Sequence, residues 1–156
     1  MGLDFYVVRV KKDYPDTARK VIDSWSYEDF TQNELCYGRK CWELVYELGC
    51  DTQYDCTTEL TFDKWTNFIE NLSVIGPFLE LIRLAYNADN NGNATAQDKW
   101  LINQYTKWYD ACFPDDDPQL GYDWSVGYMQ NFWENAGKVF EYLEDPNWEV
   151  WMVASY

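Results

Sequence analysis

The stretch from Leu3 to Val10 constrains the fold most, because it is apolar on both alternations of an extended chain. One set of side chains is Leu3, Phe5 and Val7, and the other is Tyr6, Val8 and Val10. Successive side chains of a strand point to opposite faces, and strands that are apolar on both faces lie inside sheets. We therefore predict a central strand here, with other elements packed on each side of it.

Apolar residues recur at helical spacing in five later segments. The predicted helices cover about 33–48, 62–72, 77–86, 101–112 and 126–143. Residues that stop helices follow four of them, namely Gly49, Gly76-Pro77, Pro114 and Asp145-Pro146. The segment 77–86 is apolar nearly all round, which predicts that it lies at the buried centre of the fold.

The tail from Trp148 to Ala154 is rich in Trp and Val and follows a proline, which favours a short strand. Two strands at opposite ends of the chain can pair in one sheet. We therefore predict an α+β fold that is mostly helical, with about five helices and a small sheet formed by the N- and C-terminal strands. The length of 156 residues suits a single domain over 1–156.

The chain has no histidine, which excludes the commonest general base and the Ser-His and Cys-His nucleophile arrangements. Its five cysteines form no Cys-x-x-Cys pair, so we expect free, mostly buried thiols and no zinc site. There is no secretion signal and no run of about 18 apolar residues. We expect a cytoplasmic protein with no membrane contact, no metal and no cofactor.

Charge is the least ordinary property of the chain. There are 27 acidic residues against 12 basic ones, for a formal net charge of −15. The first 40 residues hold seven of each kind, so the whole excess lies in residues 41–156. On B-DNA, 15 negative charges span about 25 Å of duplex, or about seven to eight base pairs. The surplus therefore matches the footprint of a DNA-binding protein.

Acidic residues also gather along the chain in two groups. They recur every four residues from Glu43 to Asp63, and they flank the apolar stripe of the helix predicted over 126–143. A surface of this kind would attract a positively charged groove. The alternative is a solvated face that keeps an aromatic-rich protein soluble. The candidate partner-binding residues are Asp115, Asp116, Asp117, Asp123, Glu134, Glu141 and Asp145, with Glu43, Glu47, Asp51 and Asp55 as a second patch.

Residues 87–98 match much of a twelve-residue calcium loop, with Gly92 at its sixth position. However, the loop begins with Asn87 and ends with the short Asp98 in place of a bidentate Glu, so any calcium affinity should be weak. The simpler interpretation is a helix connection. In it, Gly92 adopts a left-handed conformation and Thr95 with Asp98 forms a capping box.

Nine tryptophans raise the possibility of nucleobase stacking. Trp65, Trp108 and Trp133 lie in helical apolar stripes and are expected in the core. Four others are less well explained by periodicity: Trp25, Trp124, Trp148 and Trp151. A phosphate-bearing ligand would need a local basic pocket built from Arg9, Lys11, Lys12, Arg39 or Lys40.

The opening Met1-Gly2-Leu3-Asp4-Phe5-Tyr6 and the later segment from Glu34 to Cys41 carry a family resemblance. They resemble small phage and prophage proteins that start Met-Gly-Leu-Asp-Met-Tyr and contain Tyr-Trp-Arg-Lys-Ala. The likeness covers about the first 48 residues, with Gly38 in place of the family's Trp and Cys41 in place of its Ala. It implies a phage or mobile-element origin and no particular activity.

The sequence as a whole favours a binding protein, not an enzyme. We expect it to inhibit a host defence complex, such as a CRISPR effector or a restriction enzyme, by occupying the basic nucleic-acid site of its protein partner without itself binding nucleic acid. Two alternatives remain open. One is a nucleotide-signal sponge with an aromatic pocket beside Arg39 and Lys40, and the other is an enzyme whose clustered acids hold divalent ions for phosphoryl transfer.

Overall fold

The computed structural model describes residues 4–13, 17–39, 41, 48–49, 56–115 and 122–155. Its four strands form one antiparallel sheet in the order β2-β1-β4-β3. The elements are β1 (Asp4–Lys11), α1 (Ala18–Asp23), α2 (Tyr27–Asn33), β2 (Glu34–Arg39), β3 (Cys56–Glu59), α4 (Phe62–Leu72), the 3-10 helix η1 (Gly76–Phe78), α5 (Leu79–Asn90), α6 (Ala96–Cys112), α7 (Tyr122–Glu134), α8 (Ala136–Glu144) and β4 (Trp148–Ser155).

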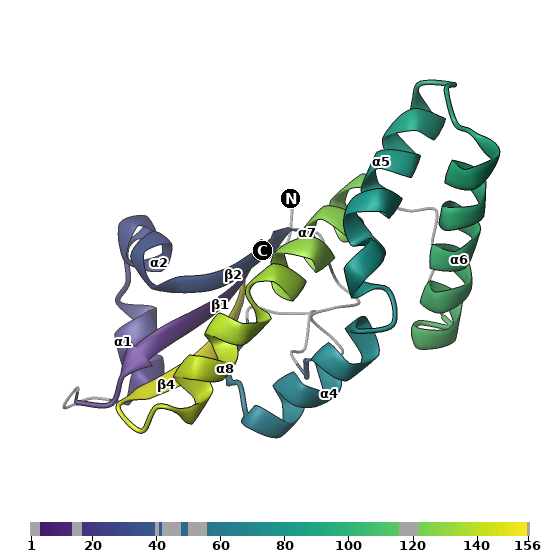
Figure 1. Cartoon of the computed structure of the whole chain (residues 1–156). Coiled ribbons are helices and arrows are strands. Elements are labelled where there is room, and N and C mark those ends of the chain that lie inside the picture. Colours follow the sequence, from purple (N-terminus) through teal and green to yellow (C-terminus); the bar gives the residue numbers. More distant parts are fainter. Residues whose placement is uncertain are drawn as a thin grey trace.

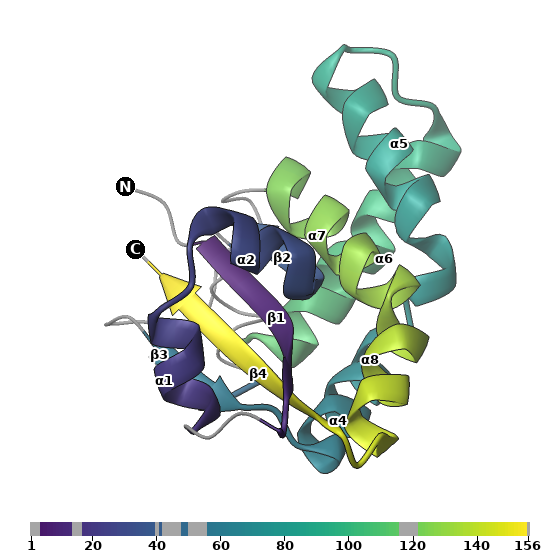
Figure 2. The same ribbon diagram turned by 90° about the vertical axis from the view of Figure 1, so that its left-hand side faces the viewer.

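Strand β1 lies inside the sheet and is covered on both faces, as predicted. Phe5 and Val7 belong to the large core, which also contains buried residues of α4, α5, α6, α7 and α8. Val8 and Val10 point the other way and form a smaller core with Ile22 of α1. Figure 2 shows α1 and α2 in front of the sheet and α7 and α8 on its other side. Two separate cores thus explain the double alternation over residues 4–10, and Leu3 of the predicted strand lies outside the described residues.

The N- and C-terminal strands pair along their whole length. Asp4 lies opposite Ser155, and Lys11 lies opposite Trp148, so that β4 is the second inner strand. This pairing confirms the predicted strand over 148–154 and the α+β class. It also places Asp4 and Ser155, the first and last described residues, opposite each other at the same end of the sheet.

The helix predicted over 33–48 is wrong in its first part, where Glu34–Arg39 forms β2. This segment pairs with β1, with Tyr37 opposite Tyr6. On its outer edge, the Tyr37 amide donates a hydrogen bond to Asn131 Oδ1 of α7 at 3.1 Å. Tertiary pairing therefore satisfies the backbone here and outweighs a weak local helix pattern. Residues 42–47 of this prediction lie outside the described residues.

Three other predicted helices are confirmed as α4, as η1 with α5, and as α6, with bounds shifted by a few residues. The Thr61 hydroxyl accepts a hydrogen bond from Lys64 N at 3.3 Å and so caps α4. Pro77 lies in the first turn of η1, where its missing N–H costs nothing. Helices α5 and α6 pack side by side at the end of the molecule away from α1 and α2 (Figure 1).

Helix α5 is not the buried centre that its composition predicted. Ile82 and Ala85 are buried, but Leu81 is 48% exposed and Leu84 is 49% exposed. The centre is instead α7, which packs against β2 and α5 and contributes the buried Met129 and Phe132. Among the described elements α5 packs against α6, α7 and η1, and these partners leave Leu81 and Leu84 partly exposed, so the helix is not covered on every side.

The single helix predicted over 126–143 is two helices, α7 and α8, separated at Asn135. Asn135 has φ −96° and ψ 4°, and its side-chain amide donates to Asn131 O at 2.8 Å. Asn and the following Gly137 are weak helix formers, and the local side-chain hydrogen bond competes with regular helix geometry. The interruption lets α8 pack along β4 while α7 packs along β2.

The described residues contain seven α-helices, in contrast to the five expected. The two additional helices, α1 and α2, have six and seven residues, which is too short for a clear periodic pattern. Ser26 begins α2 with a capping box to Asp29. Within the described part of the chain, no helix combines the length and the apolar character that crossing a membrane requires.

Candidate functional site

The predicted partner-binding acids lie on separate elements. Glu141 and Asp145 are one turn apart at the end of α8, where Asp145 N donates to Glu141 O at 3.1 Å. Glu134 is the last residue of α7, and Asp115 follows α6. The proposed common flank of Glu134, Glu141 and Asp145 assumed one continuous helix, and the break at Asn135 removes that basis.

The remaining candidate acids have no described side chain. Asp123 belongs to α7, but only its place in the helix is described. Six others lie outside the described residues altogether: Asp116, Asp117, Glu43, Glu47, Asp51 and Asp55. The acids that can be placed therefore come from α6, α7 and α8.

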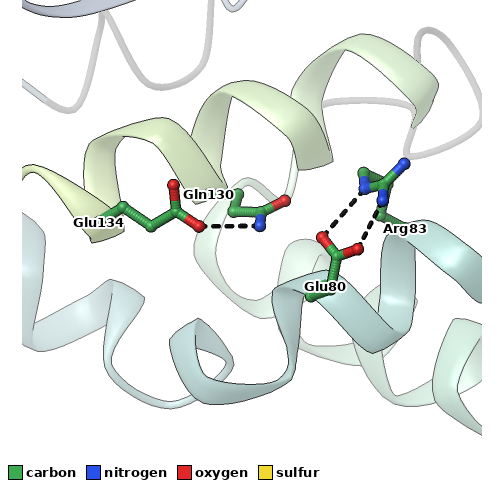
Figure 3. A network of polar contacts seen from close by, with 4 residues as sticks. All are labelled: Glu80, Arg83, Gln130 and Glu134. Carbon is green, nitrogen blue, oxygen red and sulfur yellow. Dashed lines mark hydrogen bonds and ion pairs between the residues drawn. The ribbon is translucent and has the colours of Figure 1, made fainter.

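A second carboxylate that the sequence did not single out, Glu80, lies in the same polar region as Glu134 (Figure 3). Gln130 Nε2 donates to Glu134 Oε1 at 2.9 Å, and Arg83 Nε donates to Glu80 Oε2 at 3.1 Å (Figure 3). Hydrogen bonds from Arg83 and Gln130 hold the pKa of Glu80 below its usual value. The Gln130–Glu134 pair of α7 and the Glu80–Arg83 pair of α5 thus belong to one polar region where these two helices pack together.

Two carboxylates in the described part of the chain form ion pairs with arginine side chains. Between described residues, the ion pairs are Arg39 Nε with Asp4 Oδ1 at 3.5 Å and Arg83 with Glu80. Arg9 lies between two aromatic rings instead, with its guanidinium carbon 5.0 Å from the ring centroids of both Tyr142 and Trp148. This base is thereby used in packing, not in offsetting acidic charge.

A pocket of about 400 Å³ lies on the face of the sheet that α1 and α2 cover. Four aromatic residues line it, and three of them come from the short segment between Trp25 and Phe30. The ring centroids of Tyr6 and Phe30 are 5.2 Å apart, and those of Trp25 and Phe30 are also 5.2 Å apart at an interplanar angle of 86°. Sequence reasoning missed this pocket, although the cluster of aromatic residues at 25–30 was a visible signal.

Two carboxylates, Asp4 and Asp23, belong to the lining of the same pocket. Asp4 Oδ1 accepts a hydrogen bond from the Tyr37 hydroxyl at 3.0 Å, which fixes the carboxylate in place. Burial, together with the negative charge of Asp4, raises the pKa of Tyr6. The pocket is therefore aromatic and electronegative.

The pocket has the wrong charge for a phosphate-bearing ligand. No lysine or arginine is among the described residues that line it. Arg39, which was expected beside a nucleotide, pairs with Asp4, and Lys40 lies outside the described residues. A nucleotide in this pocket would meet the carboxylate of Asp23, for which no ion pair with a described base is found, beside an Asp4 carboxylate that Arg39 already compensates in part.

A second hollow of about 400 Å³ lies between the turn before α5 and helix α6. It is mainly apolar, with Phe78 50% exposed and Trp100 58% exposed at its edge. Together with Leu81 and Leu84 of α5, these side chains place much of the exposed apolar surface on α5 and α6.

The loop at 87–98 has the structure of a helix connection. Gly92 has φ +73°, and Asp98 Oδ2 accepts hydrogen bonds from Thr95 N at 2.8 Å and from the Thr95 hydroxyl at 2.9 Å. The predicted capping box is confirmed. Among the described residues, no three His, Cys, Asp or Glu side chains are grouped as a metal ion would require.

Tryptophans predicted in the core are found there. Trp65 is fully buried, and Trp108 and Trp133 pack against the core while partly exposed. Of the tryptophans that periodicity left unexplained, Trp25 lines the aromatic pocket, Trp148 stacks on Arg9, and Trp151 Nε1 donates to Glu149 at 3.0 Å. The side chain of Trp124 is not among those described.

Cysteine burial agrees with expectation in part. Cys36 and Cys41 are buried, whereas Cys56 and Cys112 are half-buried. Burial raises the pKa of the Cys36 thiol, which keeps it protonated and unreactive. Cys50 lies outside the described residues.

Comparison with known proteins adds no relative. No protein family model, no curated protein and no solved structure matches this chain.

Proposed function

We propose that this chain is an acidic binding protein, not an enzyme, and that it occupies the basic nucleic-acid site of a protein partner. The observation that carries the proposal is the charge balance. The net charge is −15, and the ion pairs between described residues engage only Asp4 and Glu80 among the acids. Such a surface attracts a basic groove over several ångströms and competes with nucleic acid for it.

Two features of the α5–α7 region support contact beyond charge attraction. Where α5 and α7 pack together, Arg83 donates to Glu80 and Gln130 donates to Glu134, so both carboxylates are held in place. The exposed Leu81 and Leu84 lie on the same helix as Glu80. Exposed apolar side chains beside fixed charges are typical of protein-binding surfaces, because apolar contact adds affinity once charge has brought the partners together.

The likeness of the first 48 residues to small phage and prophage proteins indicates where to search for the partner. A phage gains from blocking a host defence complex that must hold DNA or RNA, such as a CRISPR effector or a restriction enzyme. We therefore expect the partner to be a host nucleoprotein, captured in competition with its nucleic acid.

The test is capture from a bacterial lysate at about 50 mM salt, followed by elution with duplex DNA or with about 300 mM salt. We expect the retained protein to bind DNA on its own and to leave the bait when duplex DNA is added. Retention that DNA does not reverse contradicts occupation of a nucleic-acid site.

Two charge-reversal variants locate the contact. The first carries Asp115→Lys, Glu134→Lys and Glu141→Lys, and we expect it to lose capture. The control carries Asp13→Lys, Glu28→Lys and Glu70→Lys, which are exposed residues of other elements, and it changes the net charge equally. Equal loss in both variants indicates non-specific charge attraction. Full capture by the first variant removes the α6–α8 acids from the interface.

A further inference from the structure

The pocket under α1 and α2 is a site that the acidic surface does not explain. Its lining includes Tyr6, Trp25, Tyr27 and Phe30 as aromatic residues, and Asp4 and Asp23 as acids. Its volume of about 400 Å³ lies in the range of pockets that receive small ligands or single side chains. It lies on the opposite face of the sheet from the helices that carry Glu134 and Glu141 (Figure 2).

Four aromatic residues line the pocket, and three of them pack against one another. Phe30 contacts Tyr6 and Trp25, each at a centroid distance of 5.2 Å, so the three rings support one another. Tyr27 also lines the pocket, and because its side chain is 79% exposed, we place it at the entrance. Ring faces carry partial negative charge, which attracts cations placed over them.

The two carboxylates differ in their partners. Asp4 Oδ1 accepts from the Tyr37 hydroxyl at 3.0 Å and lies 3.5 Å from Arg39 Nε, so this carboxylate is held and partly compensated. Asp23 is the last residue of α1 and is exposed, and no described residue donates a hydrogen bond to its side chain. Asp23 is thus the carboxylate that is available to a ligand.

We infer that this pocket binds an organic cation, and specifically the guanidinium group of an arginine side chain that the basic partner presents. A guanidinium is planar, stacks on aromatic rings and matches a carboxylate with two parallel hydrogen bonds. The pocket supplies both elements, with Tyr6, Trp25 and Phe30 for stacking and Asp23 for the hydrogen bonds. An anion is repelled by the Asp23 carboxylate, and a neutral apolar group leaves that carboxylate without a partner.

The inference rests on the proposed function in one respect only, namely that the arginine side chain comes from the basic partner protein. A protein that docks on a basic groove meets many arginine side chains, and a pocket for one of them adds specificity to charge attraction. The pocket's chemistry is independent of that source, and free arginine derivatives therefore test it directly.

The probe is N-acetyl-arginine-N-methylamide, titrated into the whole protein and followed by amide NMR. The matched control ligand is the citrulline analogue, which has the same shape without the charge. We expect resonance shifts confined to residues 4–6, 22–30 and 153–155, with a millimolar dissociation constant because the site is open. The citrulline analogue should bind at least about fivefold more weakly, as expected when one charge-assisted contact is lost.

Variants assign the contacts. Asp23→Asn should weaken binding of the arginine probe about threefold to fivefold, and Trp25→Leu should have a similar effect through lost stacking. Glu70→Gln removes one exposed carboxylate of α4 and should leave the dissociation constant unchanged. The amide spectrum of each variant verifies that the fold is retained.

The outcomes separate the pocket from the proposed function. Equal binding of both ligands, shifts spread over all acidic surfaces, or no effect of Asp23→Asn overturns the inference, whether or not a basic partner is captured. Pocket-confined binding of the arginine probe supports it. That result combined with failure to capture any DNA-competed partner overturns the proposed function alone.

Discussion

Gly76 packs directly against the indole ring of Trp133, so closely that a Cβ atom on Gly76 would lie 2.5 Å from Cδ2 of the ring. The contact joins η1, at the start of the α5–α6 pair, to the end of α7. A glycine at this position is required by the space available, because Gly76 is buried and the ring is part of the packed core.

We predict that Gly76→Ala lowers the free energy of unfolding by about 1–3 kcal/mol, since the methyl group forces the Trp133 ring or η1 to move. Urea unfolding followed by circular dichroism measures the effect. The matched control is Gly137→Ala in α8, where an added Cβ has no atom within 4 Å. That substitution should stabilise the protein by about 0.5–1 kcal/mol through helix propensity. Equal effects of the two substitutions contradict the close packing.

Substitutions on the two faces of α5 should change the free energy of unfolding by very different amounts. Replacing Leu81 and Leu84 with Gln should change the free energy of unfolding by less than about 1 kcal/mol, because both side chains are about half exposed. Ile82→Ala should cost about 2–5 kcal/mol, because Ile82 is 2% exposed in the core. Chemical unfolding compares the variants. A large loss of unfolding free energy on replacing Leu81 and Leu84 would mean that this face of α5 is covered by another part of the protein, which contradicts its exposure.

Arg9 should stabilise the fold through its aromatic neighbours. Its guanidinium carbon lies 5.0 Å from the ring centroids of Tyr142 and Trp148, and it donates a hydrogen bond to the Tyr142 hydroxyl. We predict that Arg9→Met, which retains most of the side-chain length, costs about 1–2 kcal/mol in unfolding free energy. Lys11→Met is the control, because Lys11 is exposed and lies farther from Trp148, at 5.5 Å. A loss for Lys11→Met as large as that for Arg9→Met contradicts the assignment.

The start of α2 should contribute a pH-dependent stability. Two hydrogen bonds from Ser26 hold the pKa of Asp29 below its usual value. The bond from the backbone N–H has the larger effect, and the bond from the side-chain hydroxyl has the smaller one. A lowered pKa in the folded state stabilises the fold above the unfolded pKa of about 3.9, and this contribution is lost as the pH falls through the folded pKa. The difference in stability between wild type and Asp29→Asn should therefore shrink on acidification.

Carboxyl NMR titration measures the Asp29 pKa directly. In Ser26→Ala, the side-chain hydrogen bond is absent and the pKa of Asp29 should move back toward its ordinary value. An unchanged Asp29 titration in this variant excludes the Ser26 hydroxyl as a cause.

The loop at 87–98 should behave as a helix cap and not as a calcium site. Thr95→Ala should cost about 1 kcal/mol by removing the hydroxyl that accepts from Asp98 N, whereas Thr95→Ser should retain the cap. Calcium at about 1 mM should leave the melting temperature unchanged, because the Asp98 carboxylate is already bound by Thr95. A calcium-dependent rise in the melting temperature contradicts this assignment.

Local sequence was sufficient wherever the structure depends on a strong local pattern. The double alternation at 3–10 predicted an inner strand, and periodic apolar residues with caps and stops predicted α4, α5 and α6. Prediction from local sequence failed where the local pattern was weak and contacts between distant segments determined the structure. Glu34–Arg39 became a strand because the edge of β1 was available to it, and α7 ended at Asn135 because α7 and α8 pack on different strands.

The candidate site shows the same division. Acidic residues were visible in the sequence, but the polar region that brings Glu80 of α5 near Gln130 and Glu134 of α7 required these two helices to pack together. The aromatic pocket combines Tyr6 and Asp4 of β1 with residues of α1, α2 and β4, which no spacing along the chain places together.

By itself, the sequence determined the α+β class, the pairing of its end strands, the absence of histidine chemistry and the net charge of −15. These properties depend on residue type, count and short-range pattern. Only the tertiary structure decided which carboxylates become neighbours, which face of α5 is exposed and where the aromatic pocket opens. Those properties depend on contacts between segments distant in sequence, whose free energy is gained when the whole core packs together and has no signature in any one segment.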